Sequence, residues 1–295
     1  AGLALYIAAF LAFELAHAWP ADRLEWIGIR IRACGSAALL MLSLILAIGP
    51  LCRLYPALHP LLANRRHFGV LTFVVALLHF AFMIEWYVAR GALPSLLVEL
   101  TTTGDYAKFI GFPFKVLGLL ALGILLIMAV TSHDYWLAFL GPPLWKAIHM
   151  AVYAAYGLAV MHVALGAMQW NRSPLVPTLL GLSLAIVSGL HIAAALRERR
   201  RDLAALRAPT PDGWLPVAAP ADIPDRGAVI VRERNGDRIA VFRDGNRISA
   251  VTNACAHQNG PIGEGRVIDG CITCPWHGWQ YRIEDGRAPA PFTER

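Results

Sequence analysis

Charged side chains are scarce in this sequence. Asp, Glu, Lys and Arg make up 16% of the 295 residues, whereas hydrophobic residues make up 57%. Soluble globular domains carry roughly 25% charged residues, so this composition indicates a membrane protein. The net charge of +6 does not indicate a nucleic-acid-binding protein, because the arginines lie between apolar segments and no RNA- or DNA-binding motif accompanies them.

Cysteine is also scarce, and several catalytic motifs are absent. The five cysteines imply no disulfide framework, which is compatible with a domain that faces the cytosol. We find no Gly-x-Gly-x-x-Gly with a flanking strand and helix. We also find no nucleophile constellation and no 2-His-1-carboxylate pattern for mononuclear iron. The sequence therefore predicts no catalytic residue. Because the chain begins at Ala1 inside an apolar stretch, without Met or a basic region, we expect a processed or incomplete N-terminus rather than a signal peptide.

The first two thirds of the chain consist of apolar segments, each near the ~20 residues that a bilayer crossing needs. Six segments can be drawn, at 1–19, 33–52, 67–89, 112–131, 145–170 and 175–196. The last is followed by a basic cluster from Arg197 to Arg201, which predicts an anchor at the cytoplasmic surface. We therefore expect a six-helix transmembrane α bundle over residues 1–197, with both termini on the cytoplasmic side.

The pattern changes after residue 213. Residues 198–213 are predicted to form a linker, whose flexible reach would be about 20 Å. Alternating runs then appear at 228–232, 238–243 and 248–252, separated by Asn235-Gly236 and Asp244-Gly245. These dipeptides are typical of hairpin turns. The predicted fold is thus multi-domain, with a small all-β domain over residues 214–295.

Two short motifs in this second domain can bind metal. They are Cys255-x-His257 and, further along, Cys274-x-x-His277. In a Rieske [2Fe–2S] cluster two thiolates hold one iron and two imidazoles hold the other. Cys2His2 also suits tetrahedral zinc, and Cys271-x-x-Cys274 has zinc-knuckle spacing, so zinc stays open. The unequal spacing within the two pairs favours the cluster, and we expect Cys271 to pack in a strand.

Together with Gly278 and Trp279, these motifs resemble the cluster loops of Rieske ferredoxins and of ring-hydroxylating oxygenases, over residues 214–295. They are less similar to the Rieske protein of quinol-oxidising cytochrome complexes. That branch has an extra Cys in each loop and a hydroxyl residue after the second His-Gly, where this chain has Gly260, Trp276 and Trp279. Fewer hydrogen bonds to the cluster predict a potential of roughly −150 mV rather than +300 mV. The resemblance implies a [2Fe–2S] cluster with these metal ligands: Cys255, His257, Cys274 and His277.

Histidines inside apolar segments form a second pattern. Ionisable residues in a bilayer are costly and by default functional, although each can also simply hydrogen-bond to a neighbouring helix. The third and fifth segments carry two histidines each, His67 with His79 and His149 with His162. Pairing His67 with His149, and His79 with His162, would create two bis-imidazole sites at two depths. Haem b in a helical bundle takes its axial ligands in this way.

The sequence around these histidines resembles the ferric-reductase-like transmembrane domain. The resemblance covers residues 1–197 and includes Arg65–Gly69 leading to His79, Thr131-Ser132, and Trp145–His149 leading to His162. Within that family the chain is similar to the haem-binding membrane subunit of the methionine sulfoxide reductase system.

This second resemblance implies one or two b haems. His79 and His162 match the family's outer haem ligands, and His149 matches the other histidine of the fifth segment. His67 matches less well, because relatives with two haems place the third-segment histidines one or two residues further apart. Many relatives also append a flavin- and NADPH-binding reductase, a place that the Rieske domain occupies here.

These patterns together predict a membrane electron-transfer protein of the cell inner membrane, an oxidoreductase component rather than a self-contained enzyme. A cytoplasmic Rieske domain would exchange single electrons with a soluble redox partner or another subunit. Haem would connect it to a membrane or periplasmic acceptor, quinone included, and the chain can belong to a larger membrane complex. Two alternatives stay open: a membrane-anchored ferredoxin that serves an oxygenase, and a quinone or quinol oxidoreductase subunit.

Overall fold

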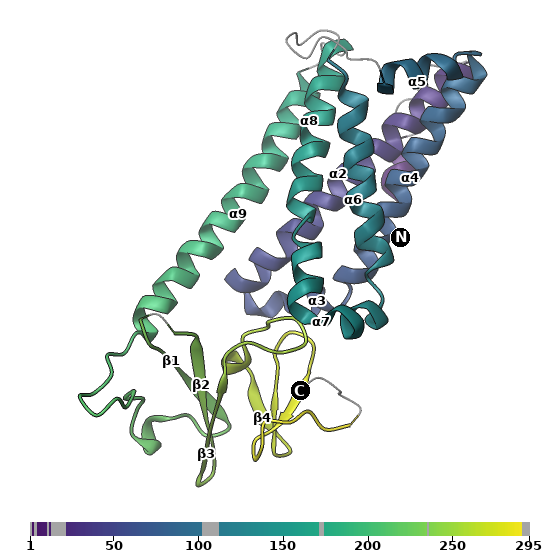
Figure 1. Ribbon diagram of the computed structural model, residues 1–295. Coiled ribbons are helices and arrows are strands. Elements are labelled where there is room, and N and C mark those ends of the chain that lie inside the picture. The colour runs from purple at the N-terminus through teal and green to yellow at the C-terminus, as the bar shows by residue number, and fades with distance from the viewer. Residues whose placement is uncertain are drawn as a thin grey trace. The chain divides into compact units, whose positions relative to one another are not determined.

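The computed structural model describes residues 2, 5–10, 12, 22–101, 112–170, 174–234 and 236–290. It contains two compact units (Figure 1). The first comprises Ala1–Ala47 and Arg65–Gly189, and the second comprises Ile48–Asn64 and Leu190–Arg295. The first unit is helical, and the second holds the small β domain.

Long apolar runs rich in Leu and Ala account for the helices, because these residues are strong helix formers and a helix satisfies every backbone group within one segment. The helices are α2 (Arg23–Leu54), α3 (Pro60–Ala63), α4 (Arg65–Ala89), α5 (Leu93–Thr101), α6 (Phe114–Val130), α7 (Asp134–His149), α8 (Val152–Trp170) and α9 (Leu175–Ala205). Short 3-10 turns occur at η1 (Pro56–Leu58), η2 (Pro220–Asp222) and η3 (Ile262–Glu264).

Four described helical stretches are long and apolar enough to cross a membrane: Arg23–Leu54, Arg65–Ala89, Pro143–Gly166 and Val176–Ala205. A fifth is formed if α6 and Asp134–Gly141, which meet at an 88° bend, count as one broken span. The helical membrane region followed by an all-β domain is confirmed. The count of six spans stays a prediction, because most of the segment at 1–19 lies outside the described residues.

Two helices are longer than the apolar segments that predicted them. α2 begins at Arg23 rather than near residue 33, and α9 continues through Ala205 rather than ending near 196. The first half of the expected linker is therefore helical. The reason is local: residues 198–205 are Ala, Leu, Arg, Glu and Asp, mostly good helix formers, and extending an existing helix needs no new nucleus.

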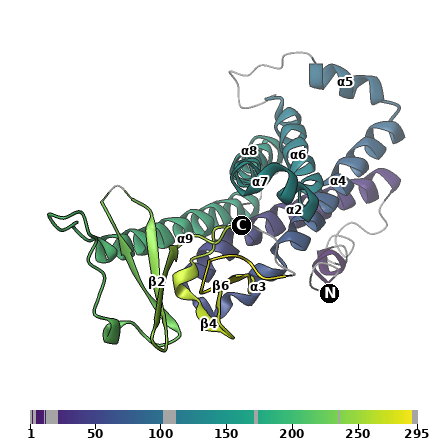
Figure 2. The same ribbon diagram turned by 60° about the horizontal axis from the view of Figure 1, so that its bottom comes forward.

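In the first unit, α6 lies along both α8 and α4 (Figures 1 and 2). A buried cluster joins α2, α6, α8 and α9 through Leu42, Leu46, Leu125, Val152, Ala155, Tyr156 and Val187. Ser183 Oγ on α9 lies 2.8 Å from Ser43 Oγ on α2 and 3.0 Å from the Tyr156 hydroxyl on α8. Such interhelical hydrogen bonds specify partners where apolar packing alone does not. Leu77, Leu120 and Ile127 are exposed, as a lipid-facing surface requires.

The β domain contains two antiparallel three-stranded sheets. The first consists of β1 (Gly227–Arg232), β2 (Arg238–Asp244) and β3 (Arg247–Thr252), and the second of β4 (Arg266–Ile268), β5 (Cys271–Thr273) and β6 (Gln280–Arg282). Asp244 pairs with Arg247, so this expected hairpin is confirmed, with Gly245 and Asn246 as the turn residues instead of Asp244-Gly245. Asn235 of the other expected turn lies outside the described residues. Cys271 lies in a strand, also as expected. The second sheet was not predicted, because three-residue strands are too short to show alternation.

The end of α9 is fastened to the first sheet. Arg238 on β2 donates to Asp202 Oδ1 at 2.6 Å and to Glu198 Oε2 at 2.8 Å. The Arg207 backbone N–H donates to the Arg232 carbonyl at 2.8 Å. The chain thus passes from α9 almost directly into contact with β1. The linker was expected to be flexible over residues 198–213, but residues 198–207 are helical or bonded to the first sheet.

Candidate cofactor sites

The first metal-binding motif lies on a tight loop between β3 and η3. The backbone N–H of Cys255 donates to the Gly260 carbonyl at 2.9 Å, and that of Asn259 donates to the Cys255 carbonyl at 2.7 Å. Asn259 has a φ of 57°, a conformation that Asn tolerates better than most residues. The loop therefore curls back on its cysteine.

The second motif repeats this geometry between β5 and β6. The Cys274 N–H donates to the Trp279 carbonyl at 2.7 Å, the Gly278 N–H donates to the Cys274 carbonyl at 3.0 Å, and Gly278 has a φ of 69°. The two loops thus share one backbone form. Each places a cysteine at its start and a histidine two or three residues later.

The two cysteines form a buried, hydrogen-bonded pair. The Cys274 thiol donates to Cys255 and, with the Tyr281 hydroxyl 3.2 Å from Cys255 Sγ, lowers the pKa of Cys255 to about 6. The Cys255 sulfur and burial raise the pKa of Cys274. Backbone N–H groups of each loop also point at the loop's own sulfur, as expected where thiolates must carry charge.

The imidazoles of His257 and His277, which come from the same two loops, form a second pair. Their ring centroids are 5.1 Å apart and their planes are perpendicular, at 90°. A metal–imidazole bond is about 2 Å long and the nitrogen lies about 1 Å from its ring centroid, so two imidazoles at a tetrahedral angle on one metal have centroids about 5 Å apart. The spacing fits one tetrahedral iron. Trp279 stacks on His257, with centroids 4.2 Å apart and planes 9° apart.

Two thiolates and two imidazoles are the donors that a Rieske two-iron cluster requires. Gly260 permits the two loops to approach, because a Cβ there would lie 2.7 Å from Cys274 Sγ. Cys271 instead lines a shallow surface pocket with Asp244 and Glu284.

A second imidazole pair lies in the helical unit. His79 on α4 and His162 on α8 have ring centroids 6.2 Å apart and planes 88° apart. Two imidazoles on opposite sides of one iron have centroids about 6 Å apart. His79 Nδ1 lies 2.8 Å from the Ile31 carbonyl, and His162 Nδ1 lies 2.9 Å from the Phe114 carbonyl. Each Nδ1 therefore donates, which leaves the Nε2 lone pair for a metal.

His67 and His149 are not brought together in this way. His67 is exposed on α4. His149 donates from Nδ1 to the Trp145 carbonyl at 3.0 Å and stacks on Trp145 with centroids 3.8 Å apart. Its Nε2 is buried without a hydrogen-bond partner. The part of the chain that the structure describes shows no ring contact between His67 and His149, and Arg66 beside His67 pairs with Asp134.

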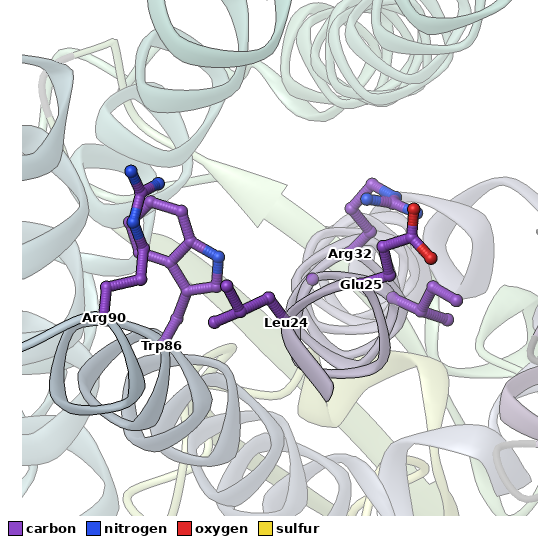
Figure 3. A pocket seen from close by; sticks show the side chains of 7 residues that line it. Leu24, Glu25, Arg32, Trp86 and Arg90 are labelled. Atoms are coloured by element: carbon purple, nitrogen blue, oxygen red, sulfur yellow. The ribbon is translucent and has the colours of Figure 1, made fainter. Parts of the chain in front are cut away.

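A cavity of about 450 Å³ lies between the start of α2 and the end of α4. Figure 3 shows Trp86 and Arg90 of α4 across from Glu25 and Arg32 of α2. The Arg90 guanidinium stacks on Trp86, 4.4 Å from the ring centroid. Trp86 follows His79 by two helical turns, roughly 10 Å, so the cavity lies further along the helix pair that carries His79.

Several residues of both sites carry no recognisable sequence motif. They are Tyr281 at the cluster site, and Gly35, Gly118, Ile31 and Phe114 beside the helical histidines. One signal does exist for the helical set. Each glycine follows its carbonyl residue by one helical turn, and each carbonyl residue precedes its histidine by 48 positions.

Two protein families match this chain. Residues 34–160 match the ferric reductase like transmembrane component, and residues 213–293 match the Rieske [2Fe-2S] domain. The chain is therefore a membrane protein that joins a ferric-reductase-like transmembrane domain to a Rieske domain with its [2Fe–2S] cluster. These are components of electron transfer.

Individual relatives show which ferric-reductase-like proteins the transmembrane part of the chain resembles. The chain is 32% identical over 174 residues to the protein-methionine-sulfoxide reductase heme-binding subunit MsrQ of Bordetella pertussis, which covers 57% of this chain and 75% of the relative. The chain therefore belongs to the family of this heme-binding subunit.

Other relatives share a smaller part. The chain is 32% identical over 101 residues to cholesterol 7-desaturase nvd of Hemicentrotus pulcherrimus, and 30% identical over 81 residues to the chloroplastic chlorophyllide a oxygenase of Chlamydomonas reinhardtii. These alignments cover 33% and 27% of this chain. They span only 21% and 12% of the two relatives. The chain therefore matches only a small part of each of these proteins.

Proposed function

We propose that this protein passes single electrons between its Rieske cluster and a haem b held by His79 and His162. The observation that carries the proposal is the pair of imidazole spacings. The 5.1 Å spacing would allow His257 and His277 to hold one iron of the cluster together, and the 6.2 Å spacing would allow His79 and His162 to hold one haem iron between them. The heme-binding family member from Bordetella pertussis supports the same reading.

The chain's own residues supply ligands and fix their states. Cys255 and Cys274 provide thiolates, and His257 and His277 provide neutral imidazoles. The carbonyls of Ile31 and Phe114 hold the helical histidines in the tautomer that can ligate through Nε2. Cluster and haem supply one-electron redox chemistry when bound. The chain then acts as an electron-transferring component, without a bond-making residue.

One haem per chain is the count that the described geometry favours. His67 and His149 would hold a second, inner haem, but His67 is exposed and the two rings are not in contact. The buried Nε2 of His149 is the remaining feature in favour of an inner site.

We further propose a sidedness. Six spans in the cell inner membrane, including 1–19, would place residues 1–197 in the bilayer and the 214–295 domain in the cytoplasm. The basic cluster from Arg197 to Arg201 supports this orientation. The electron donor is then a cytoplasmic redox protein or subunit, and the acceptor lies in the membrane or the periplasm.

Optical and EPR spectra of the purified protein, oxidised and dithionite-reduced, test the proposal. We expect a reduced b-haem spectrum and a Rieske EPR signal in one sample, with haem lost in His162→Ala and kept in the control His59→Ala. Stoichiometric zinc without acid-labile sulfide would contradict the cluster. An intact cluster without haem would contradict the haem site and favour an anchored ferredoxin that serves an oxygenase.

The cavity between α2 and α4 favours one second candidate, a quinone or quinol oxidoreductase subunit. Its aromatic wall at Trp86 and its guanidinium groups suit a planar, polar-edged ring. A short-chain quinol should then reduce the haem directly, and Trp86→Leu should slow that reduction. Equal rates in both proteins would remove this candidate.

A further inference from the structure

The two helical histidines, His79 and His162, make the same kind of contact with a neighbouring helix. His79 on α4 contacts α2, where its Nδ1 donates to the Ile31 carbonyl. His162 on α8 contacts α6, where its Nδ1 donates to the Phe114 carbonyl. In both cases the histidine follows the carbonyl residue by 48 positions. A glycine stands one turn after each carbonyl, Gly35 on α2 and Gly118 on α6.

The imidazoles fill the volume that a side chain at Gly35 or Gly118 would take. A Cβ on Gly35 would lie 2.8 Å from His79 Nδ1 and 2.9 Å from its Cε1. A Cβ on Gly118 would lie 2.7 Å from His162 Nδ1 and 2.8 Å from its Cε1. Separations this short are well inside van der Waals contact. Any larger residue at either position must therefore push the ring away from its carbonyl.

The hydrogen bond and the missing side chain together determine how each ring is turned. The carbonyl fixes the direction of Nδ1, and the glycine lets the Nδ1–Cε1 edge lie against the helix backbone. The Phe114 ring further confines His162, with centroids 5.4 Å apart at 50°. The resulting planes of His79 and His162 are 88° apart.

We infer that Gly35 and Gly118 are positioning residues that hold the two axial imidazoles with their planes perpendicular. This inference rests on the proposed haem site. Parallel axial planes split the two π-type d orbitals of low-spin ferric iron, whereas perpendicular planes leave them nearly equal in energy. Near-equality gives a strongly anisotropic low-spin EPR signal, and a large splitting gives a rhombic one. The carbonyl and glycine contacts should therefore determine the shape of the haem EPR signal, which helix packing alone would not do.

EPR of the oxidised, haem-loaded full-length protein tests this. We expect the strongly anisotropic signal in the wild type, and in Gly118→Ala and Gly35→Ala a change toward a rhombic or high-spin signal with less bound haem. The matched controls are Gly123→Ala on α6 and Gly69→Ala on α4, where a Cβ meets nothing within 4 Å. Both should keep the wild-type signal. A second portion of each sample, reduced with dithionite, should show the Rieske signal, because the cluster is EPR-active only when reduced; that signal reports whether the β domain has folded and kept its cluster.

Two results would overturn the inference. One is a rhombic signal from the wild-type haem, which is decisive even if an alanine variant fails to accumulate. The other is a Gly118→Ala signal identical to that of Gly123→Ala. Protein with a Rieske signal and no haem would instead contradict the proposed function, so the two failures are distinguishable.

Discussion

At the scale of single residues, Tyr281 ties the first cluster loop to β6. Its hydroxyl lies 3.2 Å from Cys255 Sγ and accepts the Ala256 N–H at 3.0 Å. A hydrogen bond to a cluster sulfur stabilises the more negative, reduced state and so raises the potential. The expectation near −150 mV was based on Gly260, Trp276 and Trp279 and included no such hydroxyl. With Tyr281 in place, we expect a potential above that lower end.

Tyr281→Phe should lower the cluster potential. If the hydrogen bond is worth about 1 kcal/mol more to the reduced cluster, the shift is roughly 40 mV. An EPR-monitored redox titration measures it, with the exposed Tyr135→Phe as the control. An unchanged potential in Tyr281→Phe would show that this hydroxyl does not reach the cluster.

The ligand set has a second test at this scale. Cys271→Ser should leave the Rieske spectrum nearly intact, because Cys271 lies half-buried in β5 and lines a different pocket. His277→Cys should lower the potential or abolish the cluster, because a thiolate adds negative charge at the iron. Loss of the cluster in Cys271→Ser would mean that the ligands are assigned wrongly.

At the scale of elements, the end of α9 and the first sheet are joined by a charged network. Arg238 bonds to Glu198 and Asp202, and Arg201 bonds to Glu264 in η3 at 2.5 Å. η3 follows the first cluster loop, and the Gly263 N–H donates to Asn253 Oδ1 at 2.6 Å. The helix end is thus connected to the segment that carries Cys255 and His257.

Arg238→Gln should loosen this junction. The Arg238 side chain is only 22% exposed, so its charge-assisted hydrogen bonds contribute more than a surface pair, about 1 kcal/mol in total. Amide exchange of residues 198–207 should become roughly fivefold faster. Arg247→Gln is the control, because the Arg247–Glu284 pair is 52% and 66% exposed. Equal exchange in both variants would mean that the network does not fasten α9.

At the scale of the whole molecule, the proposal makes a claim about sidedness. Protease added to right-side-out vesicles should leave the C-terminal domain intact, because the proposed orientation, based on the basic cluster from Arg197 to Arg201, puts this domain in the cytoplasm. The same protease should digest the domain in inverted vesicles. Digestion in right-side-out vesicles would reverse the topology.

Electron flow has its own test. This Rieske cluster has Gly260, Trp276 and Trp279 where the quinol-oxidising branch has its extra cysteines and its hydroxyl residue, so we expect its potential to lie below that of the haem and the cluster to act as donor. Redox titration of cluster and haem in one sample gives their order. A cluster potential above that of the haem would point to flow from the haem into the Rieske domain.

The sequence by itself determined what is local in the chain. The motifs around Cys255 and Cys274 indicated the cluster because both ligands of each pair lie within four residues on one loop. Apolar runs indicated the membrane helices, and Asp244-Gly245 indicated a hairpin, because bilayer thickness and turn geometry act on contiguous residues.

Tertiary structure decided what depends on distant residues. His67, His79, His149 and His162 look alike in sequence, yet only His79 and His162 face one another, because helix rotation and packing set which side chains meet. Tyr281 and Gly118 gained their roles from residues 26 and 44 positions away, and the equal 48-residue spacings on the helices have a meaning only once the packed helices show which residues touch. The extension of α9 to Ala205 follows from local helix propensity, but its attachment to β2 depends on Arg238, which no local pattern in residues 198–213 encodes.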